Sequence, residues 1–149
     1  MKRLPWKYLA GLIDGEGCID VQVGSQVYVR PRVRIAMADN AKFLLEMIQN
    51  SLGGHLYHRE LTSKNPTWQN ATSLEFVGYK PACMLLRNIV NHLILKKEQA
   101  RLCLWMETNI KGKQVSTEVR DAIREELKLM KRDPHRLSER AQERILAML

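Results

Sequence analysis

The amino-acid sequence predicts an α+β domain in which helices cover one face of an antiparallel sheet. Three observations lead to this prediction. Two stretches alternate between apolar and polar residues, a stretch of helical periodicity separates them, and the chain after residue 80 is helical in pattern. The expected order over residues 1–149, taken as a single domain, is α-β-β-α-β-β-α with extra C-terminal helices.

The first helix is expected to begin near Pro5, a favoured first-turn residue, and to run to about Asp14. Gly15 and Gly17 are expected to end it. Gly11 and Gly15 lie four residues apart on one face, which permits another helix to approach closely. Three apolar residues with helical spacing would form the buried stripe: Leu9, Leu12 and Ile13.

Residues 18–35 show the strongest strand pattern in the chain. The odd positions are apolar: Ile19, Val21, Val23, Val27, Val29, Pro31, Val33 and Ile35. The even positions include Asp20, Gln22, Gln26, Tyr28, Arg30, Arg32 and Arg34. This alternation predicts one buried and one polar face, with Gly24-Ser25 as the hairpin turn. Pro31 lacks a backbone donor, so the second strand should lie locally at an edge or contain a bulge.

The next stretch, from Asn40 to Leu52, has the period of a helix, with Asp39 or Asn40 as its cap and Gly53-Gly54 as its end. Its apolar positions are Phe43, Leu44, Met47, Ile48 and Leu52. A second hairpin should follow, with arms over roughly 55–61 and 68–77. In its return arm we expect Leu74 and Phe76 to point inward, and Ser73 and Glu75 to point outward.

Four further helices are expected over 81–92, 95–110, about 117–132 and about 138–149. Ser116 or Thr117 and Ser138 are plausible caps, and Pro134 separates the last two helices. Basic residues in this part of the chain are mixed with Glu and Asp, which is typical of a solvated helical surface.

Composition restricts the class of protein. The net charge of +8 favours a polyanionic partner, and no apolar run approaches the length of a membrane span. The N-terminal apolar stretch is too short for a signal peptide, so we expect an intracellular protein (cytoplasm, nucleoid or organelle) that is not secreted. Three cysteines without paired spacing predict buried reduced thiols, with neither a disulfide framework nor a zinc site.

One nine-residue motif carries a family resemblance: Leu9-Ala10-Gly11-Leu12-Ile13-Asp14-Gly15-Glu16-Gly17. It resembles the signature of the LAGLIDADG homing endonucleases, with six positions matched in a row, then Gly15 and Glu16 in place of Ala and Asp, and Gly17 matched. The resemblance also covers the order of helices and hairpins over about residues 5–110. It implies cleavage of double-stranded DNA at a long, near-palindromic site, which promotes homing of an intron or intein.

The signature occurs once in the chain. In the family that this sequence resembles, single-motif chains form homodimers whose signature helices pack against each other, and such a contact is isologous. The resemblance therefore implies a dimer interface at Leu9, Ala10, Gly11 and Leu12.

The resemblance also implies a divalent cation, Mg²⁺ or Mn²⁺, with Glu16 as catalytic metal ligand and the Gly15 carbonyl beside it. Independently, acids at a helix C-terminus meet the negative end of the macrodipole, and their dimer partners would add repulsion that a cation relieves. Asp14 is expected to support the turn. Lys96 is assigned the role of polarising the scissile phosphate or the attacking water, with Lys97 as the alternative.

The outward side chains of the sheet suit reading of the major groove, because arginine pairs with guanine edges and glutamine with adenine. The expected DNA-binding residues are Asp20, Gln22, Gln26, Tyr28, Arg30, Arg32, Arg34, Tyr57, Arg59, Gln69, Ser73 and Glu75. A register slip of one residue would present His58 and Glu60 instead of Tyr57 and Arg59. Many family members carry a polar residue near the position of Met37; either the register differs by one or two residues or the water network is held otherwise.

Two other functions agree with the same residues. One is a maturase that binds its own intron RNA, and the other is a DNA-binding regulator that does not cut. The presence of Glu16 and Lys96 favours cleavage, because a protein that only binds has no need of acids facing a phosphate.

Overall fold

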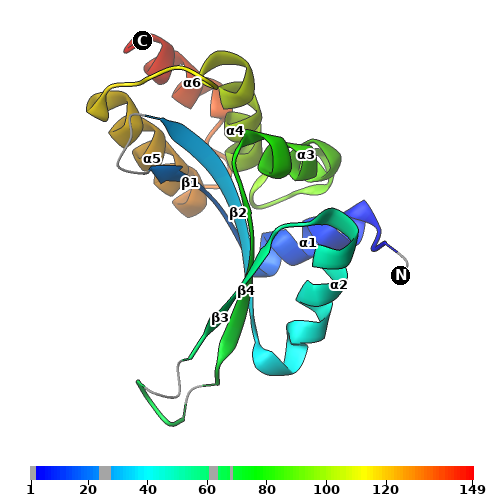
Figure 1. Cartoon of the computed structure of the whole chain (residues 1–149). Helices are drawn as coiled ribbons and strands as arrows, with labels where there is room; N and C mark the ends of the chain where they lie inside the picture. The colour runs from blue at the N-terminus through cyan, green and yellow to red at the C-terminus, as the bar shows by residue number, and fades with distance from the viewer. Residues whose placement is uncertain (1–2, 24–27, 61–63, 68) are drawn as a thin grey trace.

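The computed structural model describes residues 3–23, 28–60, 64–67 and 69–149. One antiparallel sheet has the strand order β1-β2-β4-β3. Its strands are β1 (Gly17–Val23), β2 (Val29–Ala38), β3 (His55–Arg59) and β4 (Ala71–Val77). Helices α1 (Trp6–Glu16), α2 (Lys42–Leu52) and α3 (Tyr79–Ile89) lie together on one side of the sheet (Figure 1). The predicted order of elements and the α+β class are confirmed.

The C-terminal part of the chain adds α4 (Lys97–Asn109), α5 (Thr117–Arg132) and α6 (Ser138–Leu146). Two short 3₁₀ helices, η1 (Asp39–Ala41) and η2 (Val90–His92), precede α2 and follow α3. In Figure 1 these C-terminal helices gather around the far end of the first hairpin, and α5 lies beside β1. No helix in the described ranges is long and apolar enough to cross a membrane.

The two-residue alternation of the first hairpin holds without interruption in the described strands. The β1–β2 register runs from Gly17 opposite Ile35 to Val23 opposite Val29, with no bulge. Pairing of β2 with β4 begins only at Arg32, so Pro31 lies where β2 is locally an edge towards β4, as its missing donor predicts. The predicted turn at Gly24-Ser25 and the predicted DNA contact Gln26 lie outside the described residues.

Helix α1 is longer than predicted. It continues through Gly15 to Glu16, and only Gly17 ends it, with the Gly17 amide donating to the Ile13 carbonyl. A Cβ at Gly17 would stand 2.7 Å from that carbonyl oxygen, which is closer than real Cβ atoms approach. A glycine is therefore required at this point, where the chain passes from helix directly into β1.

Helix α2 ends as predicted at Gly53 and Gly54, whose φ angles of 84° and 93° favour glycine. Its start differs: no side chain caps it, and η1 leads into it instead. Leu45 and Ile48 are its buried residues, whereas Phe43, one of the apolar positions of the helical pattern, is 67% exposed. Phe43 lies in the first turn of α2.

Two apolar clusters hold the chain together. The first joins α1, α2 and α3 to the inner face of the sheet, where Leu74 and Phe76 are fully buried as predicted. The second joins α4, α5 and α6 to the far end of the first hairpin through Val21 and Val29. The Tyr79 hydroxyl, which donates to the Val29 carbonyl at 2.8 Å, fastens α3 to β2.

The caps of the last two helices differ in kind. Ser116 accepts a hydrogen bond from the Val119 amide and caps α5, as predicted. Ser138 does not cap α6; its own amide donates instead to the carboxylate of Glu98 on α4, at 2.8 Å. A tertiary contact thus satisfies the first turn of α6.

Candidate functional site

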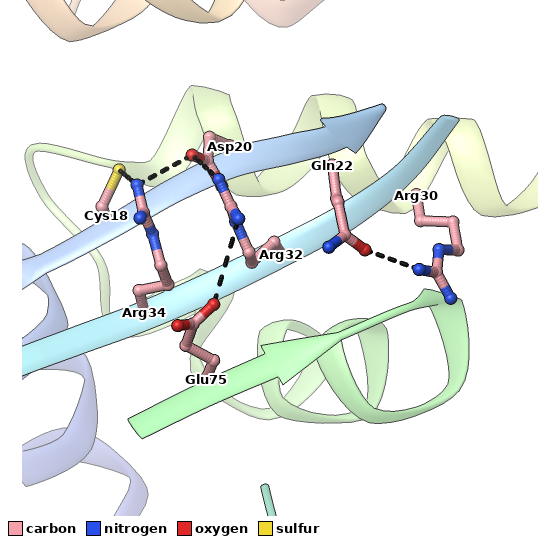
Figure 2. Close-up of polar contacts among 7 residues, drawn as sticks. All are labelled: Cys18, Asp20, Gln22, Arg30, Arg32, Arg34 and Glu75. Carbon is pink, nitrogen blue, oxygen red and sulfur yellow. Dashed lines mark hydrogen bonds and ion pairs between the residues drawn. The ribbon is translucent and has the colours of Figure 1, made fainter. Parts of the chain in front are cut away.

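The face of the sheet opposite α1, α2 and α3 carries polar side chains from β1 and β2. Figure 2 shows them in cross-strand pairs, because Cys18 faces Arg34, Asp20 faces Arg32 and Gln22 faces Arg30. Residues directly opposite each other in antiparallel strands have side chains close enough to interact. The predicted outward placement of these residues is confirmed, and the register makes them partners of one another.

Asp20 is the centre of an ion-pair network on this face. Arg32 donates to both of its carboxylate oxygens, from Nε and Nη2 at 2.9 Å each, and Arg34 donates to Asp20 Oδ2 at 3.1 Å. Glu75 on β4 lies 3.9 Å from Arg32 Nη1. The hydrogen bond to Asp20 raises the pKa of Arg32. Asp20 was predicted to accept from a base, but in the free protein its oxygens are engaged by arginines (Figure 2).

At the far end of the hairpin, the cross-strand contact is a hydrogen bond without an acidic partner. Arg30 Nη2 donates to Gln22 Oε1 at 2.5 Å, and both side chains have access to solvent. Tyr28 precedes β2 and is exposed. Gln69 is also exposed but lies before the start of β4, so no strand fixes its direction.

The β3–β4 half of the face is different. Tyr57 lies opposite Ser73 and Arg59 opposite Ala71, so both predicted residues share the polar face and are exposed. His58 projects from the other face, 3.7 Å from Asp39, which excludes the one-residue slip. Ser73 also lies on the polar face, yet it is only 5% exposed, so it offers a partner little surface.

Met37 does not take part in the polar face. Its side chain packs against the main apolar cluster, and its neighbours on the polar side are Ala36 and Ala38. Neither alanine side chain can hydrogen-bond. A register difference of one residue therefore supplies no polar side chain here, whereas a difference of two reaches Asp39, whose carboxylate accepts from the Thr72 hydroxyl at 3.1 Å.

Three residues define the C-terminal end of α1. Glu16 is the last helical residue, and it is exposed. The Asp14 carboxylate accepts from the backbone amides of Ile94 at 2.6 Å and Lys96 at 3.0 Å. Lys96 Nζ donates to the Asp14 carbonyl at 2.7 Å, which places a cation at the negative end of the helix.

These contacts show that Asp14 and Glu16 have different surroundings. Asp14 was expected to support the turn at the end of α1, but its carboxylate instead holds the segment before α4. Its oxygens are occupied, whereas Glu16 has a carboxylate open to solvent. Lys96 lies at this end of α1, while Lys97 lines a different surface hollow with Arg101 and Gln142. Of these two lysines, Lys96 is the one whose side chain donates to α1.

The donor atoms at this end suit a hard divalent ion. Mg²⁺ takes one or two carboxylates, carbonyls, waters and substrate phosphates, and Glu16 with the Gly15 carbonyl offers such oxygens. Within the described residues, however, no group of three or more His, Cys, Asp or Glu side chains could hold a metal. Within the described part of one chain, Glu16 and the Gly15 carbonyl are therefore not joined by a cluster of further side-chain ligands.

One face of α1 has no cover within the protomer. Gly11 and Gly15 are exposed, and a Cβ at either would meet nothing within 4 Å. Tyr8 is exposed on the same face. At the C-terminal end of the helix, Ile94 is 81% and Leu95 51% exposed, although both are large and apolar.

The predicted dimer interface requires a correction. Leu9 and Ala10 are buried in the protomer's own core and cannot contact a second helix. Gly11 remains on the uncovered face, and Leu12 is partly buried against the core. The error arises because the signature spans all sides of the helix, so only some of its members can face outward.

The fold resembles several solved structures. The homing endonuclease I-CvuI in complex with its target (Sro1.3) is 23% identical with a TM-score of 0.70, over 93% of this chain and 90% of that chain. The LAGLIDADG homing endonuclease I-GzeII in complex with a DNA target is 19% identical with a TM-score of 0.59, over 91% of this chain and 50% of that chain. The LAGLIDADG meganuclease I-AabMI bound to uncleaved DNA is 19% identical with a TM-score of 0.61, over 87% of this chain and 44% of that chain. No curated protein sequence matches the chain.

The class of fold is accordingly that of the LAGLIDADG homing endonucleases. Residues 9–80, which begin at the signature and end with the first residues of α3, match the family described as LAGLIDADG endonuclease. This match covers just under half of the chain and includes the nine-residue signature, which occurs once.

Proposed function

We propose that this chain is a site-specific DNA endonuclease. It makes a divalent-metal-dependent double-strand break at a long, near-palindromic target and so promotes homing of an intron or intein. The match of residues 9–80 to the LAGLIDADG endonuclease family supports this class of reaction. The observation that carries the proposal for this chain is the exposed Glu16 carboxylate at the end of a helix whose neighbouring face is uncovered.

The active form in this proposal is a symmetric dimer. The uncovered face with Tyr8, Gly11 and Gly15 meets its symmetry copy, since glycines without neighbours let two helix backbones approach closely. Ile94 and Leu95 extend the contact, because apolar side chains of this exposure gain free energy when covered. Such a dimer brings two Glu16 carboxylates towards one axis.

Glu16 and the Gly15 carbonyl, with their symmetry copies, would hold Mg²⁺ or Mn²⁺. When bound, such an ion would supply an activated water and would stabilise charge on the leaving oxygen of the phosphodiester. Lys96, which the Asp14 carbonyl holds, contributes a fixed positive charge towards the scissile phosphate. Asp14 acts indirectly by positioning the backbone before α4.

The polar face of the sheet is proposed to lie in the major groove. Arg30, Arg32 and Arg34 have the bidentate geometry that suits guanine edges. In the free protein Asp20 aligns two of them, so in this proposal Asp20 positions arginines rather than reading a base itself. Tyr57 and Arg59 extend the same surface along β3.

A randomised library of double-stranded DNA tests the proposal without knowledge of the target. Wild-type protein and Glu16→Gln are incubated with the library in Mg²⁺ and in Ca²⁺, and the cut ends are sequenced. The expected result is cleavage at one nearly symmetric motif, by wild type in Mg²⁺ only. Bound but uncut DNA under every condition would overturn the enzyme and leave a DNA-binding regulator, while preferential binding of intron RNA would favour a maturase.

A further inference from the structure

A pocket of about 430 Å³ lies where the first hairpin meets α5. The sheet contributes Asp20, Arg32 and Arg34 to its lining, and α5 contributes three basic residues. We call these three the α5 basic stripe: Arg124, Lys128 and Lys131. Their spacing of four and three residues puts them on one side of the helix. Figure 1 shows α5 beside β1, which is one of the two edge strands of the sheet.

The charges around this pocket are unbalanced. Five cationic side chains line it, and Asp20 is the one acidic residue among the lining side chains that the structure describes. Asp20 already accepts from Arg32 and Arg34. All three side chains of the α5 basic stripe are exposed, and within the described ranges none of them has an acidic partner within 4.0 Å.

Arg34 gives a second sign that the pocket is incomplete. Its Nε is buried and has no hydrogen-bond partner. A buried donor without an acceptor is energetically unfavourable, and an anion that accepts from it would remove that cost. The pocket thus combines an excess of positive charge with a donor that lacks an acceptor.

The position of the pocket indicates which anion it takes. The major groove is about 12 Å wide, and strands lie about 4.8 Å apart, so a sheet that enters the groove has sugar-phosphate backbone just beyond its edge. On the β1 side, α5 occupies that place. We infer that the α5 basic stripe binds phosphates of the DNA backbone next to the groove that the sheet enters. This inference rests on the proposed DNA-binding function and adds a surface to it.

The role of the stripe differs from that of the sheet arginines. Phosphate contacts fix position and supply affinity but carry no base information. Removal of the stripe should therefore weaken binding to every DNA sequence by the same factor. It should also reduce the salt dependence of binding, by about one unit of slope for each phosphate that the variant no longer binds.

The test compares wild type with the triple variant Arg124→Gln/Lys128→Gln/Lys131→Gln, in Ca²⁺, on a selected target and on random duplex DNA from 50 to 300 mM salt. The expected result is an equal loss of affinity on both DNAs, on the order of tenfold or more at 0.1 M salt, with a shallower slope. Lys111→Gln/Lys113→Gln/Arg140→Gln is the matched control, because these residues are exposed and do not line the pocket. It removes the same formal charge and should change the slope by less than one unit.

A triple variant with wild-type affinity and slope, or a control variant with the same loss, would overturn the inference while leaving the proposed function intact. Wild-type protein that binds no duplex DNA at any salt concentration would overturn both. Thermal unfolding of each variant checks that the fold persists. If the triple variant does not fold, Lys128→Gln alone should give about a third of the change in slope, and no change would refute the inference.

Discussion

The basic residues of the first hairpin and those of α5 line the same pocket, but they differ in whether an acidic side chain pairs with them. Arg32 and Arg34 are held by Asp20 within hydrogen-bonding distance, whereas Arg124 and Lys128 have no such acidic partner within the described part of the chain. Fixed direction suits the reading of base edges, and unpaired charge suits attraction of a phosphate backbone. If the proposed DNA binding holds, the sheet arginines would supply specificity and the α5 basic stripe would supply affinity.

The largest effect on this comparison is expected from Arg32→Gln. It removes a bidentate guanidinium from the centre of the sheet face, which should cost about 2 kcal/mol, or about 30-fold, on the selected target. Random duplex DNA should lose less than about threefold, and base preference should relax at one position. Arg30→Gln serves as the matched variant, with a change at a different base position. Equal losses on both DNAs would show that Arg32 contacts phosphate only.

The next largest effect is expected on stability, from a substitution that removes the ion pairs between α5 and its neighbours. Glu126, on the opposite side of α5 from the stripe, is 1% exposed in its side chain and bonds to Arg136 at 2.9 Å and Arg144 at 3.3 Å. Glu126→Gln should lower the free energy of unfolding by about 2 kcal/mol, less than for a fully buried pair because both arginines are partly exposed. Urea denaturation measures this, and Glu125→Gln, at an exposed pair, should change stability by less than about 0.5 kcal/mol.

The same residue predicts a pH dependence. Burial acts to raise the pKa of Glu126, but the hydrogen bonds and charges of Arg136 and Arg144 outweigh it and hold the pKa below its ordinary value. A lowered pKa in the folded state stabilises the protein above the unfolded pKa of roughly 4.3, and this contribution is lost as the pH falls through the folded value. Wild type should therefore lose more stability on acidification than Glu126→Gln. Parallel pH profiles would contradict the ion-pair account.

A smaller effect is expected from Asp20→Asn, which distinguishes positioning from base reading. If Asp20 aligns arginines, its loss should lower the ratio of specific to random affinity severalfold, and preference should change at the base positions beneath Arg32 and Arg34. Affinity for random DNA should rise, because a negative charge leaves the face. A change confined to a single cytosine position would instead show that Asp20 accepts from a base directly.

The smallest effect concerns thiol labelling. Cys18 lies on the polar face beside Arg34, whereas burial raises the pKa of Cys83 to about 12 and keeps that thiol protonated. At pH 8 an alkylating reagent should therefore modify Cys18 first, and bound DNA should slow that reaction by about threefold or more. Mass spectrometry of the labelled protein measures both rates. Labelling of Cys18 at the same rate with saturating DNA would place the DNA on another surface.

Much of the fold follows from local pattern. The alternation over residues 18–35 predicted the hairpin and its two faces, and the glycines at 17, 53 and 54 marked the ends of α1 and α2. These features depend on periodicity and on backbone conformations that glycine adopts most easily, which are properties of short segments.

The features that the sequence analysis missed or misassigned depend on tertiary contacts. The signature could not reveal that Leu9 and Ala10 face the core, because that depends on where the sheet lies. Residue types alone did not pair Asp20 with two arginines or join Glu98 to the first turn of α6. The basic residues of α5 were interpreted as a solvated surface, since their approach to β1 depends on contacts far apart in the sequence.

The most direct test of the central claim separates binding from cutting at Glu16. On the selected target, affinity in Ca²⁺ and the single-turnover cleavage rate in Mg²⁺ are measured for wild type and Glu16→Gln. The proposal predicts affinities within about threefold of each other and a cleavage rate lowered by on the order of a thousandfold or more in the variant. Cleavage by Glu16→Gln at close to the wild-type rate would contradict the assignment of the chemistry to the end of α1.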